Sequence, residues 1–153
     1  MPDSLLLEVL EDENVGRVLT RVRVENLEDL LAERKGALPS DQVRRLEIME
    51  ALVDTGSTMF ALPTRYIEQL GLKKCRDRTV VTTRGIATAG IYDAVRVTIQ
   101  GRECVAEVME VPDSCPALVG QLPLEALDLV VNPLAGTLTG NPAHGGEHVL
   151  ELL

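Results

Sequence analysis

The stretch Ala51-Leu52-Val53-Asp54-Thr55-Gly56-Ser57-Thr58 decides how the rest of this chain is interpreted. Three apolar residues lead into Asp54, and another apolar run follows at residues 59–62, so the carboxylate is expected beside a low-dielectric interior. Gly56 permits a close approach of the backbone, and neighbouring N–H groups can therefore point at the carboxylate. The residues on either side of this glycine supply hydroxyl groups. A capped turn is the alternative interpretation, because Asp and Ser are common turn formers.

Length and charge limit the classes of protein to which the chain can belong. It has 153 residues and a net charge of −9, from 15 basic and 24 acidic side chains. A chain of this length is expected to form one domain, which we place at residues 16–153, after a separate acidic arm at residues 1–15. Only 2% of the residues are aromatic, and together with the negative charge this argues against a base-stacking or phosphate-neutralising surface. We therefore expect no nucleic-acid partner.

The cysteines and the N-terminal sequence bear on the compartment. Cys75, Cys104 and Cys115 are odd in number and form no C-x-x-C pair, which fits neither a disulfide framework nor a zinc knuckle. We expect them to be small buried hydrophobic residues in a reducing compartment. No apolar run reaches the length of about 18 residues that a membrane span needs, and the start lacks the basic region of a secretory signal. The prediction is a cytoplasmic protein without a membrane partner.

Alternation of apolar and polar residues dominates the chain. In residues 18–24 every second residue shares one face, and in residues 43–53 the side chains of Leu46, Ile48 and Leu52 are expected on one side. Further strands are predicted at residues 79–83, 92–99, 104–111, 118–120, 129–131, 134–139 and 148–152, with a hairpin turn at Gln100-Gly101. Short helices or turns are predicted at residues 26–34, 62–70 and 123–127. Many short strands with one or two short helices predict an all-β barrel or sandwich.

Two motifs make the sequence resemble the retropepsin-like aspartic proteases, the single-domain, homodimeric relatives of pepsin. The first is Asp54-Thr55-Gly56-Ser57 with its apolar flank, and the second is Ala117-Leu118-Val119-Gly120, which matches the apolar segment before the C-terminal helix of that family. About 65 residues separate the two motifs, which leaves room for a flap hairpin. The wider frame, including Asn141-Pro142-Ala143-His144-Gly145, resembles a bacterial branch of the family. One departure is Gln121, which follows the second motif where viral members usually carry Arg or Asn.

The resemblance implies a closed, retropepsin-like β-barrel or sandwich that works as a homodimer. A twofold axis would bring the Asp54 residues of the two subunits together. Because two carboxyl groups in one site cannot both ionise, the pair would hold a single proton. The charged carboxylate would take a proton from a bound water, which attacks the peptide carbonyl, while the other carboxyl donates to the developing oxyanion. This chemistry needs no cofactor.

The resemblance also assigns roles to the residues around Asp54. The hydroxyl groups of Thr55 would lock the two loops across the axis, Gly56 would orient the carboxylate, and Ser57 would hydrogen-bond its outer oxygen. Leu118, Val119 and Gly120 form the second motif. A flap hairpin over the cleft is expected at residues 79–92, and the residues assigned to it are Arg84, Gly85, Ile86 and Gly90. It lacks the glycine-rich tip of viral members.

Two other motifs compete with this interpretation. Asp54-x-Gly56-Ser57-Thr58 also fits the phosphate-binding turn of the actin-like and sugar-kinase ATPases, but that fold needs two large domains. His144-Gly145-Gly146-Glu147-His148 matches the H-x-x-E-H string of inverted zincins. Its two glycines oppose the helix on which that site depends, because each costs about 1 kcal/mol of helix propensity. We therefore expect no metal site.

The expected function is that of an aspartic endopeptidase, which hydrolyses peptide bonds in a peptide or protein substrate. The alternative is a catalytically idle retropepsin-fold module for dimerisation or peptide binding. The intact Asp-Thr-Gly-Ser sequence favours the enzyme, because a pure binding module has no need of the carboxylate.

Overall fold

The computed structural model describes residues 17–152, so the arm predicted at residues 1–15 lies outside the described residues. The strands are β1 (Val18–Asn26), β2 (Arg45–Val53), β3 (Phe60–Pro63), β4 (Lys74–Thr82), β5 (Gly85–Ile99), β6 (Arg102–Val111), β7 (Leu118–Val119), β8 (Leu129–Asn132) and β9 (Thr137–Gly140). The α-helices are α2 (Leu27–Arg34), α3 (Thr64–Gln69) and α4 (Gln121–Leu127), and the 3-10 turns are η1 (Ser40–Gln42) and η2 (Pro142–His144). The all-β prediction is confirmed, with three short α-helices in the described chain where one or two were expected.

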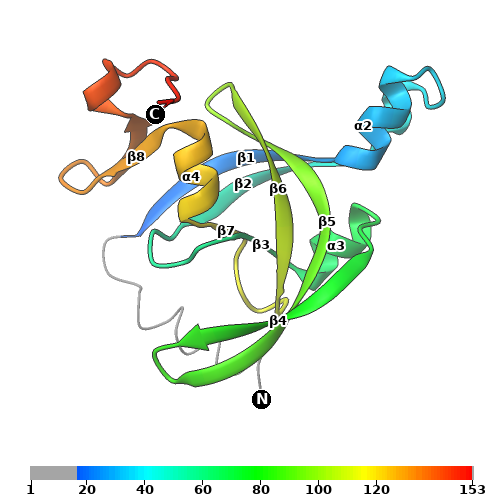
Figure 1. The fold of residues 1–153 in the computed structure, drawn as a ribbon, viewed down its shortest axis with the longest axis horizontal. Coiled ribbons are helices and arrows are strands. Elements are labelled where there is room, and N and C mark those ends of the chain that lie inside the picture. The colour runs from blue at the N-terminus through cyan, green and yellow to red at the C-terminus, as the bar shows by residue number, and fades with distance from the viewer. Residues whose placement is uncertain (1–16, 153) are drawn as a thin grey trace.

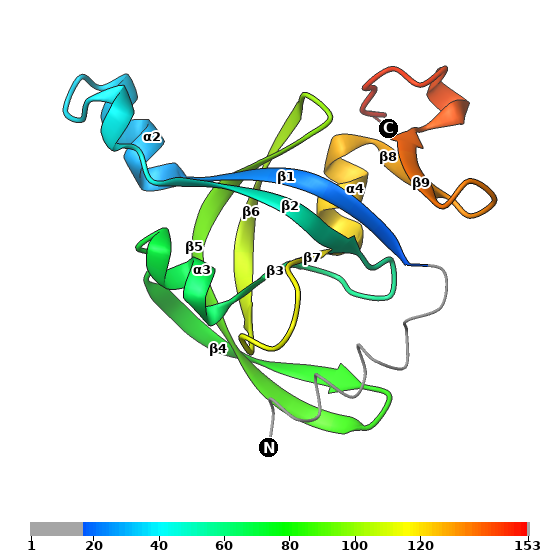
Figure 2. The same ribbon diagram turned by 180° about the vertical axis from the view of Figure 1, so that it is seen from behind.

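One large sheet dominates the molecule. Its strand order is β1-β2-β7-β3-β6-β5-β4, and β1 also pairs with β5, while β8 and β9 form a separate two-stranded sheet. The β4–β5 hairpin extends at the bottom of Figure 1, at the opposite end from α4, β8 and the C-terminus, and Figure 2 shows the same arrangement from behind. The predicted turn at Gln100-Gly101 joins β5 to β6, with positive φ angles of 52° and 77°.

The main core is aliphatic, as the scarcity of aromatic residues predicts. Val22, Val24, Val95 and Val97 are all 0% exposed, and Val24 lies opposite Val97 where β1 pairs with β5. Burying each such side chain contributes about 1.5 to 3 kcal/mol to folding. Phe60, the single phenylalanine of the chain, is 1% exposed and packs in the same cluster.

A β-bulge changes which side of β2 faces the main core. Thr20 lies opposite Ala51 but Val22 lies opposite Ile48, so β2 carries one residue more than β1 between these pairs. Ile48 packs in the main cluster, whereas Leu52 packs in a second cluster with Ala61, Val111, Cys115 and Leu118. The prediction that Leu52 shares a face with Leu46 and Ile48 is therefore wrong, because the extra residue reverses the alternation.

Two further predictions need correction. The strand expected at residues 148–152 does not form, since this segment lies against the molecule as irregular chain, with Val149 N–H donating to Asp128 Oδ2 at 3.0 Å. Its apolar side chains are largely exposed, so no buried face fixes a strand register. Among the cysteines, Cys115 is buried and Cys104 is half-buried, but Cys75 is exposed on β4, where its thiol faces Asp93 Oδ1 at 3.2 Å.

The helices are short. None of those between residues 17 and 152 has the length and apolar character needed to cross a lipid bilayer.

A buried carboxylate joins three strands at the point where β1 pairs on both of its sides. Glu25 is 2% exposed and lies directly opposite Arg45 of β2 and Arg96 of β5. Its Oε2 accepts a hydrogen bond from Arg45 Nε at 3.0 Å, and its Oε1 accepts from Arg96 Nη2 at 2.8 Å. A buried carboxylate is costly unless paired, so this pairing makes the junction of β1, β2 and β5 specific.

Replacing this carboxylate should destabilise the fold. In Glu25→Gln the amide has one acceptor oxygen for two guanidinium groups, and its NH2 group faces a positive charge. We expect the free energy of unfolding to fall by about 2 kcal/mol in urea denaturation. The matched control is Glu68→Gln, an exposed glutamate on α3, which should change it by less than about 0.5 kcal/mol. Equal effects of the two substitutions would contradict the role of Glu25.

Candidate active site

The parallel pairing of β2 with β7 places the two sequence motifs side by side. Leu52 lies opposite Leu118 and Val53 lies opposite Val119. Asp54, the next residue after β2, donates its backbone N–H to Val119 O at 2.9 Å. Asp54 therefore lies at the carboxyl ends of these two neighbouring strands, where its backbone is held by the second motif.

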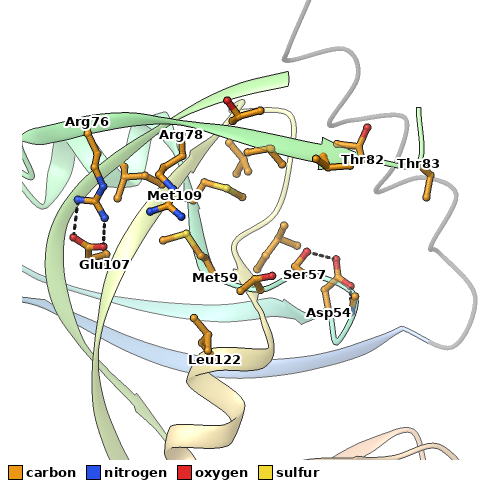
Figure 3. A pocket seen from close by; sticks show the side chains of 18 residues that line it. Asp54, Ser57, Met59, Arg76, Arg78, Thr82, Thr83, Glu107, Met109 and Leu122 are labelled. Atoms are coloured by element: carbon orange, nitrogen blue, oxygen red, sulfur yellow. Dashed lines mark hydrogen bonds and ion pairs between the residues drawn. The ribbon is translucent and has the colours of Figure 1, made fainter. Parts of the chain in front are cut away.

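The Asp54 carboxylate is oriented by its own loop. Asp54 is buried, with 8% of its surface exposed. Oδ1 accepts a hydrogen bond from the Gly56 backbone N–H at 3.0 Å, and Oδ2 accepts from the Ser57 hydroxyl at 2.8 Å (Figure 3). The Ser57 N–H also donates to Asp54 O at 3.1 Å, which closes a tight turn. Thr55, the residue that follows Asp54, is exposed in this turn.

Helix α4 begins against the same loop. The first N–H groups of a helix have no partner within it, and here Gln121 N–H donates to Ser57 O at 2.8 Å and Leu122 N–H donates to Thr58 O at 2.9 Å. This contact requires a residue without a side chain at position 120. A Cβ atom on Gly120 would lie 2.4 Å from Met59 O and 2.8 Å from Ser57 O. The second motif therefore supports the Asp54 loop through its glycine.

A pocket of about 590 Å³ opens between the Asp54 loop and the β4–β5 hairpin. Asp54, Ser57 and Met59 line one part of it, and Figure 3 shows their side chains facing the same space as those of β4 and β6. From β4 and the turn after it come Arg76, Arg78, Thr79, Val80, Val81, Thr82 and Thr83, and from β6 come Glu107, Met109 and Val111. The pocket thus offers an open space beside an oriented carboxylate.

The sequence analysis did not identify the pocket residues of β4. For four of them, Arg76, Arg78, Val80 and Thr82, the signal in the sequence is a spacing of two, which places them on one face of a strand. The other three pocket residues of this segment lie outside that series. The period itself does not reveal which face meets the pocket.

The residues assigned to the flap lie in the β4–β5 hairpin but do not line this pocket. The turn follows Thr82, whose hydroxyl donates to Gly85 O at 3.0 Å and accepts from Arg84 N–H at 3.2 Å. Ile86 lies opposite Val81, and both side chains are exposed, at 74% and 80%. Gly90 is buried further down β5.

The H-x-x-E-H string is placed in the C-terminal segment. His144 Nδ1 lies 2.6 Å from Asp128 Oδ2, and its Nε2 lies 2.8 Å from Glu151 Oε1. His148 Nε2 lies 3.0 Å from the Ala126 carbonyl oxygen, so the two imidazoles have separate partners. Among residues 17–152, no group of three or more His, Cys, Asp or Glu side chains is arranged to hold a metal ion.

Comparison with known families agrees with the geometry. A family model described as aspartyl protease matches residues 47–141, which is well over half of the chain and includes both the Asp54 loop and Gly120. The chain therefore belongs to the retropepsin-like aspartyl protease family. No curated protein was matched. The more specific assignment to a bacterial branch stays a prediction.

Adding one methyl group to Gly120 should disturb the whole site. In Gly120→Ala the new Cβ meets backbone atoms of residues 57–59, which cannot rotate away, so the loop or α4 must move. We expect a loss of about 2 to 3 kcal/mol in the free energy of unfolding, measured by urea denaturation. The control is Gly90→Ala, whose Cβ would meet only side-chain atoms, of Tyr92 and Lys74 at 3.1 and 3.2 Å, and which should cost under about 1 kcal/mol. A smaller effect at Gly120 than at Gly90 would be inconsistent with this packing.

The contacts of His144 predict a pH dependence of stability. Hydrogen bonds with Glu151, and then with Asp128, raise the pKa of His144 above 6.5, while the hydrogen bond with His144 lowers the pKa of Asp128 below 3.8. The stabilisation by His144 is thus fully present below about pH 6.5 and is lost as the pH rises through its folded-state pKa. The stabilisation by Asp128 is lost only as the pH falls through its lowered pKa.

The variant His144→Gln should therefore lose more thermal stability at pH 6 than at pH 8.5, relative to the wild type at the same pH. The Tm at each pH, together with an NMR titration of the imidazole, measures this. His148→Gln is the control, since its ring nitrogen faces a carbonyl oxygen rather than a carboxylate. A Tm loss of equal size at both pH values would argue against the protonated His144 contact.

Proposed function

We propose that the chain is an aspartic endopeptidase whose site is completed by a second copy of itself. The observation that carries the proposal is the Asp54 carboxylate, nearly buried, held by Gly56 N–H and Ser57 Oγ, and facing an open pocket of about 590 Å³. The family supports a protease of the hydrolase class. Members with one such motif in each chain need a twofold axis to provide the second carboxyl group.

In the proposed dimer, the two Asp54 carboxyl groups share one proton, because two negative charges in one site repel each other. The charged member accepts a proton from a water molecule, which attacks the carbonyl carbon of the peptide bond. The protonated member donates to the oxyanion as the tetrahedral intermediate forms. Ser57 and Gly56 keep each carboxylate in the orientation that both transfers need, and no cofactor takes part.

Other elements of the molecule have proposed roles in the same dimer. Exposed Thr55 is available to contact the partner loop across the axis. The β4–β5 hairpin, as a flap, would close over a bound peptide and exclude water from the two carboxyl groups. The closed barrel expected from the family resemblance is part of this proposal, and the pairing of β1 with both β2 and β5 supports it.

The decisive variant is Asp54→Asn, which keeps the shape of the side chain but removes the general base. We expect peptidase activity on a diverse peptide library between about pH 4 and 7 to fall by at least about a thousandfold. Wild type and variant should both sediment at about twice 16.6 kDa at micromolar concentration. The wild-type rate should follow a bell in pH that belongs to the carboxyl pair, and EDTA should not reduce it.

Asp41→Asn is the matched control, because Asp41 is an exposed aspartate in η1, on the loop between α2 and β2. It should leave activity and dimer unchanged. Activity that survives Asp54→Asn, or a fully active monomer, would refute the proposal. A dimer that cuts no peptide in the library would favour the peptide-binding module instead.

A further inference from the structure

The wall of the pocket that β4 provides is positively charged. Arg76 and Arg78 both line it and lie two residues apart on β4, so they share one face of the strand. Figure 3 shows the Arg78 side chain reaching from β4 toward Met109. This is unexpected in a chain with a net charge of −9, because a random patch of its surface would be acidic.

The two arginines differ in how their charge is balanced. Arg76 forms a two-pronged ion pair with Glu107, in which Nη2 lies 2.6 Å from Oε1 and Nη1 lies 3.1 Å from Oε2. Arg78 makes no hydrogen bond or ion pair with any side chain in residues 17–152. Its charge is felt at Glu107, whose pKa lies below its usual value mainly through the hydrogen bond from Arg76 and, to a smaller extent, through the nearby charges of Arg76 and Arg78.

Of the charged side chains that line the pocket, one cation and one anion have no counter-charge in contact with them among the described residues. The charged residues that line it are Asp54, Arg76, Arg78 and Glu107. Glu107 neutralises Arg76, and Asp54 lies at the opposite end of the pocket from Arg78 in Figure 3. The Arg78 guanidinium is exposed and therefore accessible to a ligand that enters the pocket.

The apolar surroundings of Arg78 strengthen its electrostatic attraction to an anionic group that binds there. The apolar side chains of Met59, Met109 and Leu122 line the same pocket, and a ligand packed on them displaces water from the guanidinium. Electrostatic contacts gain strength as water is removed. A guanidinium offers a planar pair of N–H donors that matches a carboxylate, and such contacts are stronger than neutral hydrogen bonds.

We propose that Arg78 is a specificity-determining residue that binds the carboxylate of an Asp or Glu side chain in the peptide substrate. The inference rests on the proposed peptidase function for the identity of the ligand as a peptide. Because Arg78 and Asp54 lie at opposite ends of the pocket, the acidic residue occupies a substrate position away from the scissile bond, and the residues at the bond itself contact the apolar part.

The test uses the full-length protein and pairs of peptides that differ only by Glu or Gln at one position, scanned along the sequence. For the wild type, kcat/KM should be higher for the Glu peptide at one position by about tenfold or more. In Arg78→Gln this preference should disappear through loss of rate on the Glu peptide, while the rate on the Gln peptide is kept. In Arg78→Glu a Lys peptide should become the preferred member at the same position. Arg34→Gln, an exposed arginine on α2 with the same change of net charge, should retain the wild-type preference.

A binding measurement separates this inference from the proposed function. Asp54→Asn binds peptides without cutting them, so fluorescence anisotropy with the Glu and Gln peptides, with and without Arg78→Gln, reports the contact alone. If no peptide is cut by the wild type but the Glu peptide binds more tightly in an Arg78-dependent way, the peptidase proposal fails and the Arg78 contact stands. If Glu and Gln peptides are cut and bound equally at every position, or if Arg78→Gln keeps the preference, the Arg78 inference is overturned.

Discussion

The short parallel contact between β2 and β7 is the constraint on which the site depends. Only two pairs of residues form it, yet it brings together segments that lie about 65 residues apart in the chain. Long-range parallel pairing is costly in chain entropy, and here it is reinforced at both ends. Leu52 N–H donates to Ala117 O at 2.8 Å before the pairs, and Asp54 N–H donates to Val119 O after them. Gly120 then allows α4 to begin directly against the Asp54 loop.

The buried carboxylates of the molecule differ in whether an arginine pairs with them. Glu25 is buried between two arginines, and a second carboxylate, Asp29, accepts Arg44 Nε at 2.8 Å and Nη2 at 2.9 Å. These carboxylates are fixed by counter-charges. Asp54 is as buried as Asp29, at 8% exposure each, but within residues 17–152 its oxygens accept only from a backbone N–H and a hydroxyl. Asp54 is thus oriented by its own loop rather than by a counter-charge.

The sequence predicted the parts of the structure that depend on local pattern. The strand before Asp54, the β5–β6 hairpin and helix α4 follow from periodicity and from turn residues, and all are confirmed, whereas β3 after Asp54 was expected only as an apolar run. The bulge in β2 was missed because it depends on how β1 aligns with its neighbour, which no pattern within β2 records. The strand predicted at residues 148–152 was wrong for a related reason: alternation shows that a segment could pair, but a strand also needs a free edge and a face to bury.

The pocket shows most clearly what a single sequence leaves out. The Asp54 loop was identifiable because the carboxylate and the groups that hydrogen-bond to it lie within four consecutive residues. Arg78 was not, because an arginine on an alternating strand is usually a solvated surface residue, and only the fold turns this face of β4 toward Asp54. β4 ends the strand order and, among the described strands, pairs only with β5, and a peptide of the proposed substrate class could add its backbone to an edge strand of this kind. A peptide held in this way repeats the two-residue period of β4. Its alternate side chains would then meet Arg78 and the apolar residues in turn, and the strand that binds the backbone would also select the side chains.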